Sequence, residues 1–176
     1  RGLNMNTFYN KVIAVFENPE TKAKFTDKGI SPVSYIDLYA GQDLNEENFE
    51  LFSQNALLID WDIDYGGDAP KATVTLYCCY EQLRDTSNIS MNRDLGLKFL
   101  DFIATIDAIA STIESETTGK LEIVSEGFNK MDSIVDIYLL TYECSYSGRK
   151  NPLSKYQAGD YDTLDLKPNL TVEFDD

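Results

Sequence analysis

The chain has no histidine among its 176 residues. Histidine supplies the commonest general base, the partner of Ser and Cys nucleophiles, and most transition-metal ligands, so its absence removes those chemistries. The cysteines, three in number, have no imidazole to activate them. Two of them, Cys78 and Cys79, are neighbours and would point to opposite faces of a strand, which argues against a disulfide framework and favours a reducing compartment. We predict a protein that is not an enzyme and that holds no cofactor and no metal ion.

Positive charge is also scarce, with 15 Lys and Arg against 30 Asp and Glu and a net charge of −15. Nucleic-acid binding by phosphate neutralisation needs basic patches, so this composition argues against it and is compatible with DNA contact only as a repulsive wall. No apolar run approaches the roughly 20 residues of a membrane span, and no basic segment followed by an apolar one opens the chain. We expect no membrane association.

What the chain does have is an apolar fraction of 43% and an aromatic fraction of 12%, which are typical of a globular domain. The length fits one domain with a tail. We predict a single α+β domain over residues 1–147 and an extended C-terminal arm over 148–176, within which only residues 170–174 have the composition of a strand.

Periodicity places the elements of that domain. Apolar residues at helical spacing predict a helix over 7–18, after which Pro19 either ends the helix or starts a further turn. Residues 31–42 are rich in β-formers and predict an extended segment or edge strand. Strict alternation over 57–65 and 71–82, joined by GGDAP, predicts an antiparallel hairpin.

The second half of the domain contains the longest predicted helix, over 95–114, with Asp94 as its N-cap. Its polar face is expected to carry Lys98, Asp101, Thr105 and Asp107. Two strands over 120–128 and 133–147 follow; the second is apolar on both faces, as expected for a central strand or for one covered by a neighbouring subunit. The order predicts a mostly antiparallel sheet with the long helix and the N-terminal helix packed on it.

The stretch LLIDWDIDYGGD has aspartates at every second position, which raises the possibility of a calcium loop. An EF-hand loop has oxygen ligands at positions 1, 3 and 5, glycine at 6 and glutamate at 12. Counting from Asp60 puts Tyr65 at position 6 and Lys71 at position 12, between strand patterns where helices should be. The sequence therefore predicts an amphipathic strand, with Trp61 on the buried face and Asp60, Asp62 and Asp64 in water.

Two other patterns leave alternatives open. One alternative is a metal-dependent hydrolase or nuclease, which would have to bring together Asp60, Asp62, Asp101 or Asp107, and Glu122. Acidic residues scattered over a protein surface give the same sequence pattern. An acidic protein-binding module is a further alternative. Tyr138, Tyr142 and Tyr146 share one strand face, and such a row is either a candidate subunit interface or a ladder within the sheet.

The order of segments resembles a known family. The segments that carry the resemblance are, in order, an N-terminal helix, IDLYAGQ with Gln42, NALLIDWDIDYG, KATVTLYCCYEQ, a long helix and a closing hairpin. The chain resembles tailed-phage neck proteins of the tail terminator and head–tail joining family, including forms from phages of gut Bacteroidetes. The resemblance covers residues 7–147, and the order of elements carries most of it.

The resemblance implies a structural virion protein that assembles as a homo-oligomeric ring around the DNA channel and performs no chemistry. Its implied partners are its own copies and other neck, portal or tail proteins, with DNA as a passing polymer. The implied location is the neck or tail of a virion made in the cytoplasm of a bacterial host. The arm departs from the family pattern, which leaves open a terminator, an adaptor or another neck ring. In such a ring Asp60, Asp62 and Asp64 are candidates to face the channel.

Overall fold

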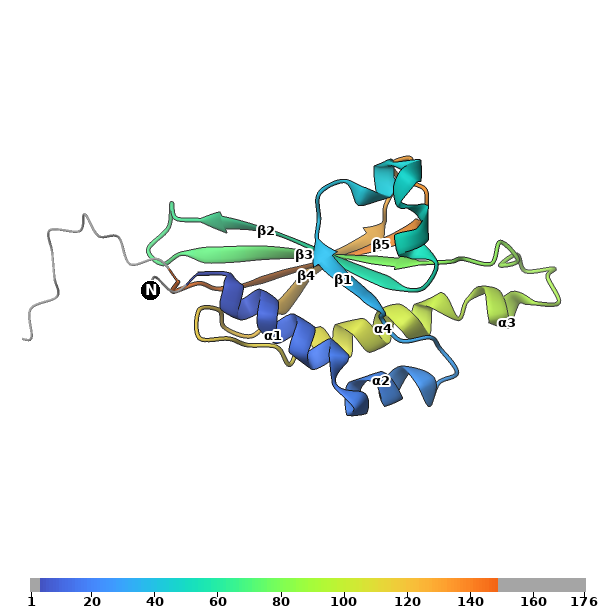
Figure 1. Ribbon diagram of the computed structural model, residues 1–176, viewed down its shortest axis with the longest axis horizontal. Coiled ribbons are helices and arrows are strands. Elements are labelled where there is room, and N and C mark those ends of the chain that lie inside the picture. The colour runs from blue at the N-terminus through green and yellow to red at the C-terminus, as the bar shows by residue number, and fades with distance from the viewer. Residues whose placement is uncertain (1–3, 149–176) are drawn as a thin grey trace, which may run out of the picture.

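The computed structural model describes residues 4–148, which form a five-stranded sheet with its α-helices on one side and two short 3-10 helices on the other (Figure 1). The strand order is β1-β2-β3-β5-β4, and all neighbours are antiparallel except β1 and β2, which are parallel. The strands are β1 (Tyr35–Leu38), β2 (Ala56–Asp64), β3 (Lys71–Tyr80), β4 (Glu122–Phe128) and β5 (Asp136–Ser145). The α+β class and the mostly antiparallel sheet are confirmed.

Two helices precede the sheet, α1 (Asn6–Glu17) and α2 (Pro19–Thr26). Of the two outcomes expected at Pro19, the structure has the second: Pro19 opens α2. Proline suits the first turn because the N–H that it lacks would have had no partner there. The Asn18 side chain caps this helix by accepting a 2.8 Å hydrogen bond from the Glu20 N–H. The chain leaves α2 through Gly29, whose φ of 65° lies in the left-handed region.

The main core lies between the sheet and the helices. Alternate residues of β2 and β3 point toward α1 and α4 (Phe99–Ala110), with Leu57 and Ile59 buried and Trp61 half-buried on this face. Each fully buried aliphatic or aromatic side chain contributes about 1.5–3 kcal/mol by leaving water. The helices contribute the buried residues Phe8, Val12, Phe16, Phe25, Phe102, Ile106 and Ile109. The predicted burial of the Trp61 face of β2 is thus confirmed.

The predicted helix over 95–114 is wrong in its extent. It is divided into α3 (Arg93–Gly96) and α4, with turn residues 97–98 between them. A Cβ at Gly96 would lie 2.7 Å from the Asp85 carbonyl oxygen, so the chain passes too close at this point for another residue type. Asp94 lies inside α3 and is not an N-cap.

Thr105, expected on the polar face of this helix, is buried instead. Its hydroxyl accepts a 2.8 Å hydrogen bond from the Lys28 ammonium and donates one of 2.7 Å to the Asp101 carbonyl. The packing of α2 on α4 covers the threonine, and a helical pattern taken alone does not reveal a second helix on its polar side.

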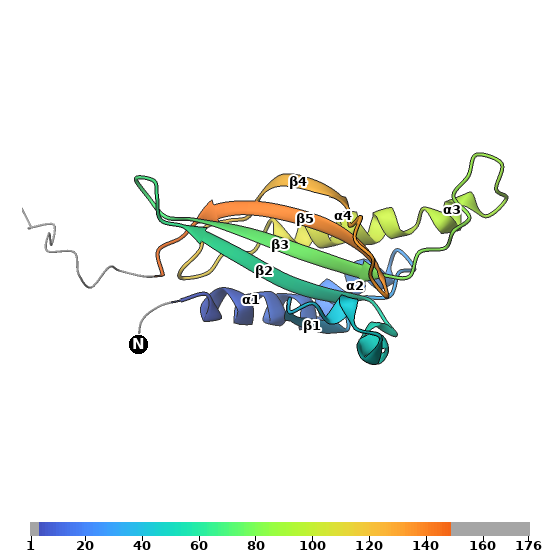
Figure 2. The same ribbon diagram turned by 90° about the horizontal axis from the view of Figure 1, so that it is seen from above.

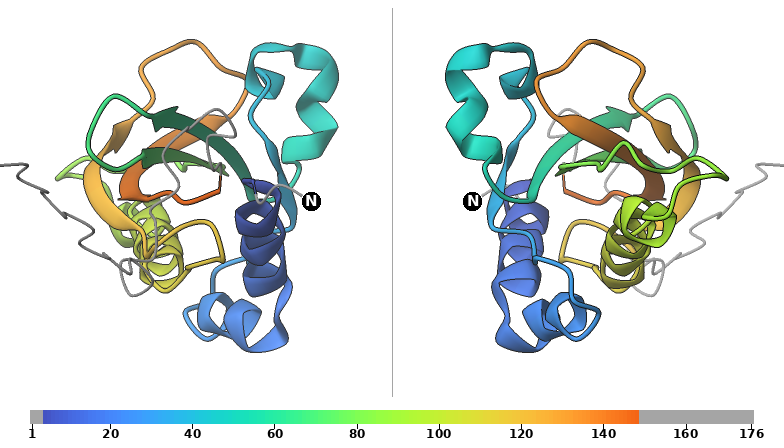
Figure 3. Two further views of the ribbon diagram at one scale, coloured as in Figure 1. Left: turned by 90° about the vertical axis from the view of Figure 1, so that its left-hand side faces the viewer. Right: turned by 90° about the vertical axis from the view of Figure 1, so that its right-hand side faces the viewer.

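The opposite face of the sheet, called here the outer face, is covered over only one half. Two 3-10 helices, η1 (Gln42–Leu44) and η2 (Glu46–Phe52), lie there, on the side away from α1 and α4 (Figure 3). A second core of Ala56, Leu58, Cys79 and Ile137 is buried on this side, with Phe52 packed against it. The apolar residues on both faces of β5 are therefore explained by a central strand that the chain itself covers.

The cysteines are free and buried, and Cys78 and Cys79 lie in the two different cores, as their adjacency in a strand predicted. The predicted arm lies outside the described residues except for Gly148, as does the strand expected over 170–174. Within residues 4–148, no helix is long and apolar enough to cross a membrane.

Candidate functional site

The uncovered half of the outer face is acidic. Asp60, Asp62 and Asp64 are all exposed there, on the part of β2 that runs toward the hairpin turn. Viewed from above in Figure 2, this hairpin end has no helix over it. The sequence-predicted placement of these three side chains in water is confirmed.

The register of the sheet adds two more carboxylates to this surface. Asp62 lies opposite Thr73, Thr73 opposite Glu143, and Glu143 opposite Glu122, so the three acids share one row across four strands. We call Asp60, Asp62, Asp64, Glu122 and Glu143 the acidic face. Sequence analysis did not place Glu143 there, because its neighbours depend on the pairing of β5 with β3, which periodicity does not specify.

Two cations, Lys71 and Lys120, border the same surface beside Glu122 and Glu143. Lys71 is opposite Asp64 in the β2–β3 register, where an opposite-charge cross-strand pair is mildly stabilising. Side chains two apart on one strand face are roughly 6.6–7 Å apart, so the three aspartates repel one another through water of high dielectric. The five carboxylates of the acidic face therefore keep a negative potential that these two lysines do not cancel.

The aspartates also have a structural role at an open edge. β1 ends at Leu38, opposite Ile59, so β2 has no neighbour on that side beyond Ile59. The Asp60 carboxylate accepts a 2.8 Å hydrogen bond from the N–H of Trp61, and Asp62 accepts one of 3.0 Å from the N–H of Ile63. These carboxylates occupy backbone donors that another strand would use, and charged groups at an edge oppose strand addition.

The acids considered for a metal-dependent hydrolase are divided between the two faces of the sheet: Asp60, Asp62 and Glu122 share the acidic face, and Asp101 and Asp107 do not. Asp101 and Asp107 lie on α4, which is on the other side of the sheet from Asp60 and Asp62. Asp107 accepts a hydrogen bond from the Tyr142 hydroxyl. Within residues 4–148, no group of three or more His, Cys, Asp or Glu side chains could hold a metal ion. The geometry therefore favours a repulsive surface and gives no support to a two-metal site.

A buried acid lies under the covered half. Asp43 of η1 is 1% exposed, and its carboxylate lies near the Tyr39 hydroxyl. The stacked rings of Tyr39 and Tyr77, 4.0 Å apart, belong to the same region, and burial followed by the charge of Asp43 raises the pKa of Tyr39. Sequence analysis missed Asp43, because the polar composition around it predicts a solvated connection.

The tyrosine row lies on the helix side of the sheet. Tyr142 and Tyr146 are buried in the main core, and Tyr138 is half-buried beside Phe128, with ring centroids 5.1 Å apart. Burial inside the chain leaves Tyr142 and Tyr146 almost no surface to offer a neighbouring subunit, and the cross-strand neighbours of Tyr142 are Val74 and Ile123. Burial, and then the hydrogen bond to Asp107, raise the pKa of the Tyr142 phenol.

Comparison with known proteins adds no relative to this description: no protein-family model matches the chain, and no curated protein matches it significantly.

Proposed function

We propose that the chain is a structural virion protein of a phage head-to-tail connector, a tail terminator or another neck ring, that assembles as a homo-oligomeric ring around the DNA channel. The observation that carries the proposal is the acidic face, an uncovered row of carboxylates on a rigid sheet. The order of elements that resembles the neck family supports the same assignment. Its partners are its own copies and neighbouring neck, portal or tail proteins.

An acidic face is suited to the wall of a DNA channel. Phosphates approaching Asp60, Asp62 and Asp64 meet charges of the same sign, so DNA passes without binding. A single charge pair at about 4 Å is worth only about 1 kcal/mol in water, and a ring multiplies each carboxylate by the number of subunits. DNA is then contacted non-specifically while it moves through the ring.

The edge of β2 supports the same orientation. Because Asp60 and Asp62 occupy the free N–H groups of this edge, strand addition between subunits is opposed at the acidic end. Subunit contacts then lie away from it, which leaves the acidic face open to the lumen.

Native mass spectrometry and negative-stain imaging of the full chain test the assembly directly. Closed rings of one defined stoichiometry are expected. A chain that stays monomeric alone and also in the presence of portal or tail proteins would contradict the proposal. A large rise in melting temperature with Mg²⁺ or Ca²⁺, together with phosphodiester hydrolysis, would favour the hydrolase alternative instead.

A charge-reversal pair of variants tests the channel assignment. Replacing Asp60, Asp62 and Asp64 by lysine should make the rings retain duplex DNA in an electrophoretic mobility assay. The matched control reverses three exposed acids on the helical side, Glu17, Glu20 and Asp27, and so changes the net charge equally. Equal DNA retention by both variants would show that the acidic face has no special position.

A further inference from the structure

β4 forms an open edge of the sheet. It is the last strand in the order β1-β2-β3-β5-β4, and its one strand neighbour within residues 4–148 is β5 (Figures 2 and 3). The backbone N–H and C=O groups of β4 that point away from β5 therefore have no strand to pair with in the described part of the chain. An unpaired row of this kind is a template for a further strand.

The edge of β4 is less protected than the edge of β2. On β2, the carboxylates of Asp60 and Asp62 accept hydrogen bonds from the N–H groups of the residues that follow them. β4 carries the acids Glu122 and Glu126, but among residues 4–148 no side chain accepts a hydrogen bond from an N–H of this strand. The donors of β4 are thus available to a partner.

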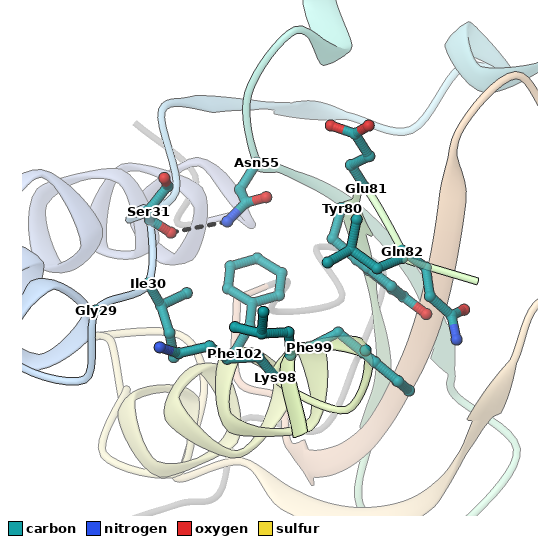
Figure 4. A pocket seen from close by; sticks show the side chains of 13 residues that line it. Gly29, Ile30, Ser31, Asn55, Tyr80, Glu81, Gln82, Lys98, Phe99 and Phe102 are labelled. Atoms are coloured by element: carbon teal, nitrogen blue, oxygen red, sulfur yellow. Dashed lines mark hydrogen bonds between the residues drawn. The ribbon is translucent and has the colours of Figure 1, made fainter. Parts of the chain in front are cut away.

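Apolar side chains are exposed along β4. Ile123 is 45% exposed, Val124 51% and Phe128 53%. Phe128 lies at the end of an aromatic row that continues into the main core: its ring centroid is 5.8 Å from that of Phe99, which stacks on Tyr80 at 5.0 Å in the wall of a cavity (Figure 4). An apolar side chain beside Phe128 would extend this row and remove apolar surface from water. The open edge therefore fits a strand that has an apolar face.

The regular part of β4 is short. A β-bulge between Ile123 and Ser125 breaks the register with β5, and residues 125–128 then pair with β5 one to one. Because a bulge bends the strand and interrupts its row of donors and acceptors, a long added strand does not fit this edge. A short strand does.

A segment of matching length and pattern lies in the arm, outside the described residues. Residues 170–174, LTVEF, alternate apolar and polar side chains, which puts Leu170, Val172 and Phe174 on one face of an extended chain. Within residues 148–176 they are the part with the composition of a strand.

The chain is long enough to bring this segment to its own β4. Glu143, near the end of β5, lies opposite Glu122, so the chain leaves the sheet beside the start of β4. Residues 149–169 span up to about 70 Å when extended, whereas the seven residues of β4 span about 23 Å. Covalent attachment gives the segment an effective concentration on the order of 1 mM at this edge, which favours it over a segment of another molecule.

We propose that residues 170–174 add to β4 of the same chain as a sixth strand. The apolar face of the segment then lies on the side of Phe128 and α4, and Thr171 and Glu173 lie on the side of Ser125. The outward backbone groups of β4 gain partners, and the arm covers an edge to which another copy could otherwise add a strand. The inference concerns a single copy, so it does not depend on the proposed ring function.

Intramolecular disulfides test the pairing in the full chain, whose native thiols at Cys78, Cys79 and Cys144 are buried. Ser125→Cys is combined in turn with Thr171→Cys and with Glu173→Cys, on the same side of the sheet. The control combines it with Val172→Cys, on the other side. During mild oxidation of dilute protein, at least one of the first two pairs should close within the monomer several-fold faster than the control, as followed by non-reducing electrophoresis.

Two results of the disulfide experiment would overturn the proposal. Equal rates for all three pairs would mean that the tether alone brings the thiols together, without a strand of defined faces. Disulfides that form between molecules would mean that the arm of a second copy occupies β4.

Hydrogen exchange gives a readout that needs no added thiol. Replacing Thr171 and Val172 by proline removes two consecutive donors, one of which faces β4 in any register. The matched control replaces Thr163 and Leu164, which precede the segment in the arm. The outward amides of residues 125–128 should be protected in the unsubstituted chain and in the control, and should exchange several-fold faster in the first variant. Fast exchange in the unsubstituted chain, or protection that the first variant retains, would overturn the proposal.

Discussion

The Tyr142 hydroxyl donates a 2.9 Å hydrogen bond to Asp107 Oδ1, which ties the buried middle of β5 to α4. Tyr142→Phe keeps the ring and removes this bond, so we predict a loss of about 1 kcal/mol in the free energy of unfolding. Urea unfolding followed by circular dichroism measures it. The control is Tyr65→Phe at a half-exposed ring, which should leave stability unchanged. An equal loss in both variants would contradict the role given to the Tyr142–Asp107 bond.

Alkaline pH should destabilise the fold through its buried thiols. Burial raises the pKa of Cys144 to about 11 and that of Cys79 to about 12, from a usual value of 9.0. A group with a raised folded pKa stabilises the fold below its unfolded pKa, and the contribution is lost as pH rises toward the folded value. The unfolding free energy should fall between pH 9 and pH 11 by about 1.4 kcal/mol per pH unit for each thiol. Urea unfolding across that range should show a shallower slope for Cys144→Ala, and a flat profile for the unsubstituted chain would contradict the assignment.

Two glycines provide a matched pair for the loop geometry. A Cβ at Gly96 would lie 2.7 Å from the Asp85 carbonyl oxygen, whereas a Cβ at Gly127 would meet nothing within 4 Å. Gly96→Ala should therefore cost about 1–3 kcal/mol by displacing the 83–92 loop. Gly127→Ala should be neutral, or stabilising by up to about 1 kcal/mol, because it restricts the unfolded chain. Thermal unfolding of the two variants compares them, and equal melting temperatures would exclude the close contact.

Two sets of substitutions at the edge of β2 separate the effect of the aspartates' charge from the effect of their hydrogen bonds. Asparagine at positions 60 and 62 removes charge but retains an oxygen that can accept from the N–H groups of Trp61 and Ile63. Valine at both positions removes the acceptor and adds β-propensity, which exposes the edge to other strands. We predict increased self-association by light scattering for the double valine variant and little change for the double asparagine variant. Equal behaviour of the two would mean that the edge bonds do not prevent association.

The parts of the fold that sequence predicted are those with strong local patterns. Strict alternation identified β2 and β3 and put Trp61 and the aspartates on the correct faces, because one buried face fixes the period of a strand. At Pro19 local chemistry left two outcomes open, an end of the first helix or the start of a further turn, and the structure has the second.

What sequence did not predict depends on contacts between distant segments. The division of the helix at Gly96 follows from the approach of Asp85, eleven positions earlier in the chain. Thr105 is buried where Lys28, in the turn that follows α2, reaches it, and Glu143 joins the acidic face through strand register. The burial of Tyr142 could have been foreseen from its position in a central strand, but only once β5 was known to be central.

The position of the acidic face in an assembled ring tests the account most directly, and a cryo-electron microscopy reconstruction of the oligomer measures it. The account predicts that Asp60, Asp62 and Asp64 line the lumen of that ring. A ring with the three aspartates on its outer rim would contradict the channel assignment, and so the central claim.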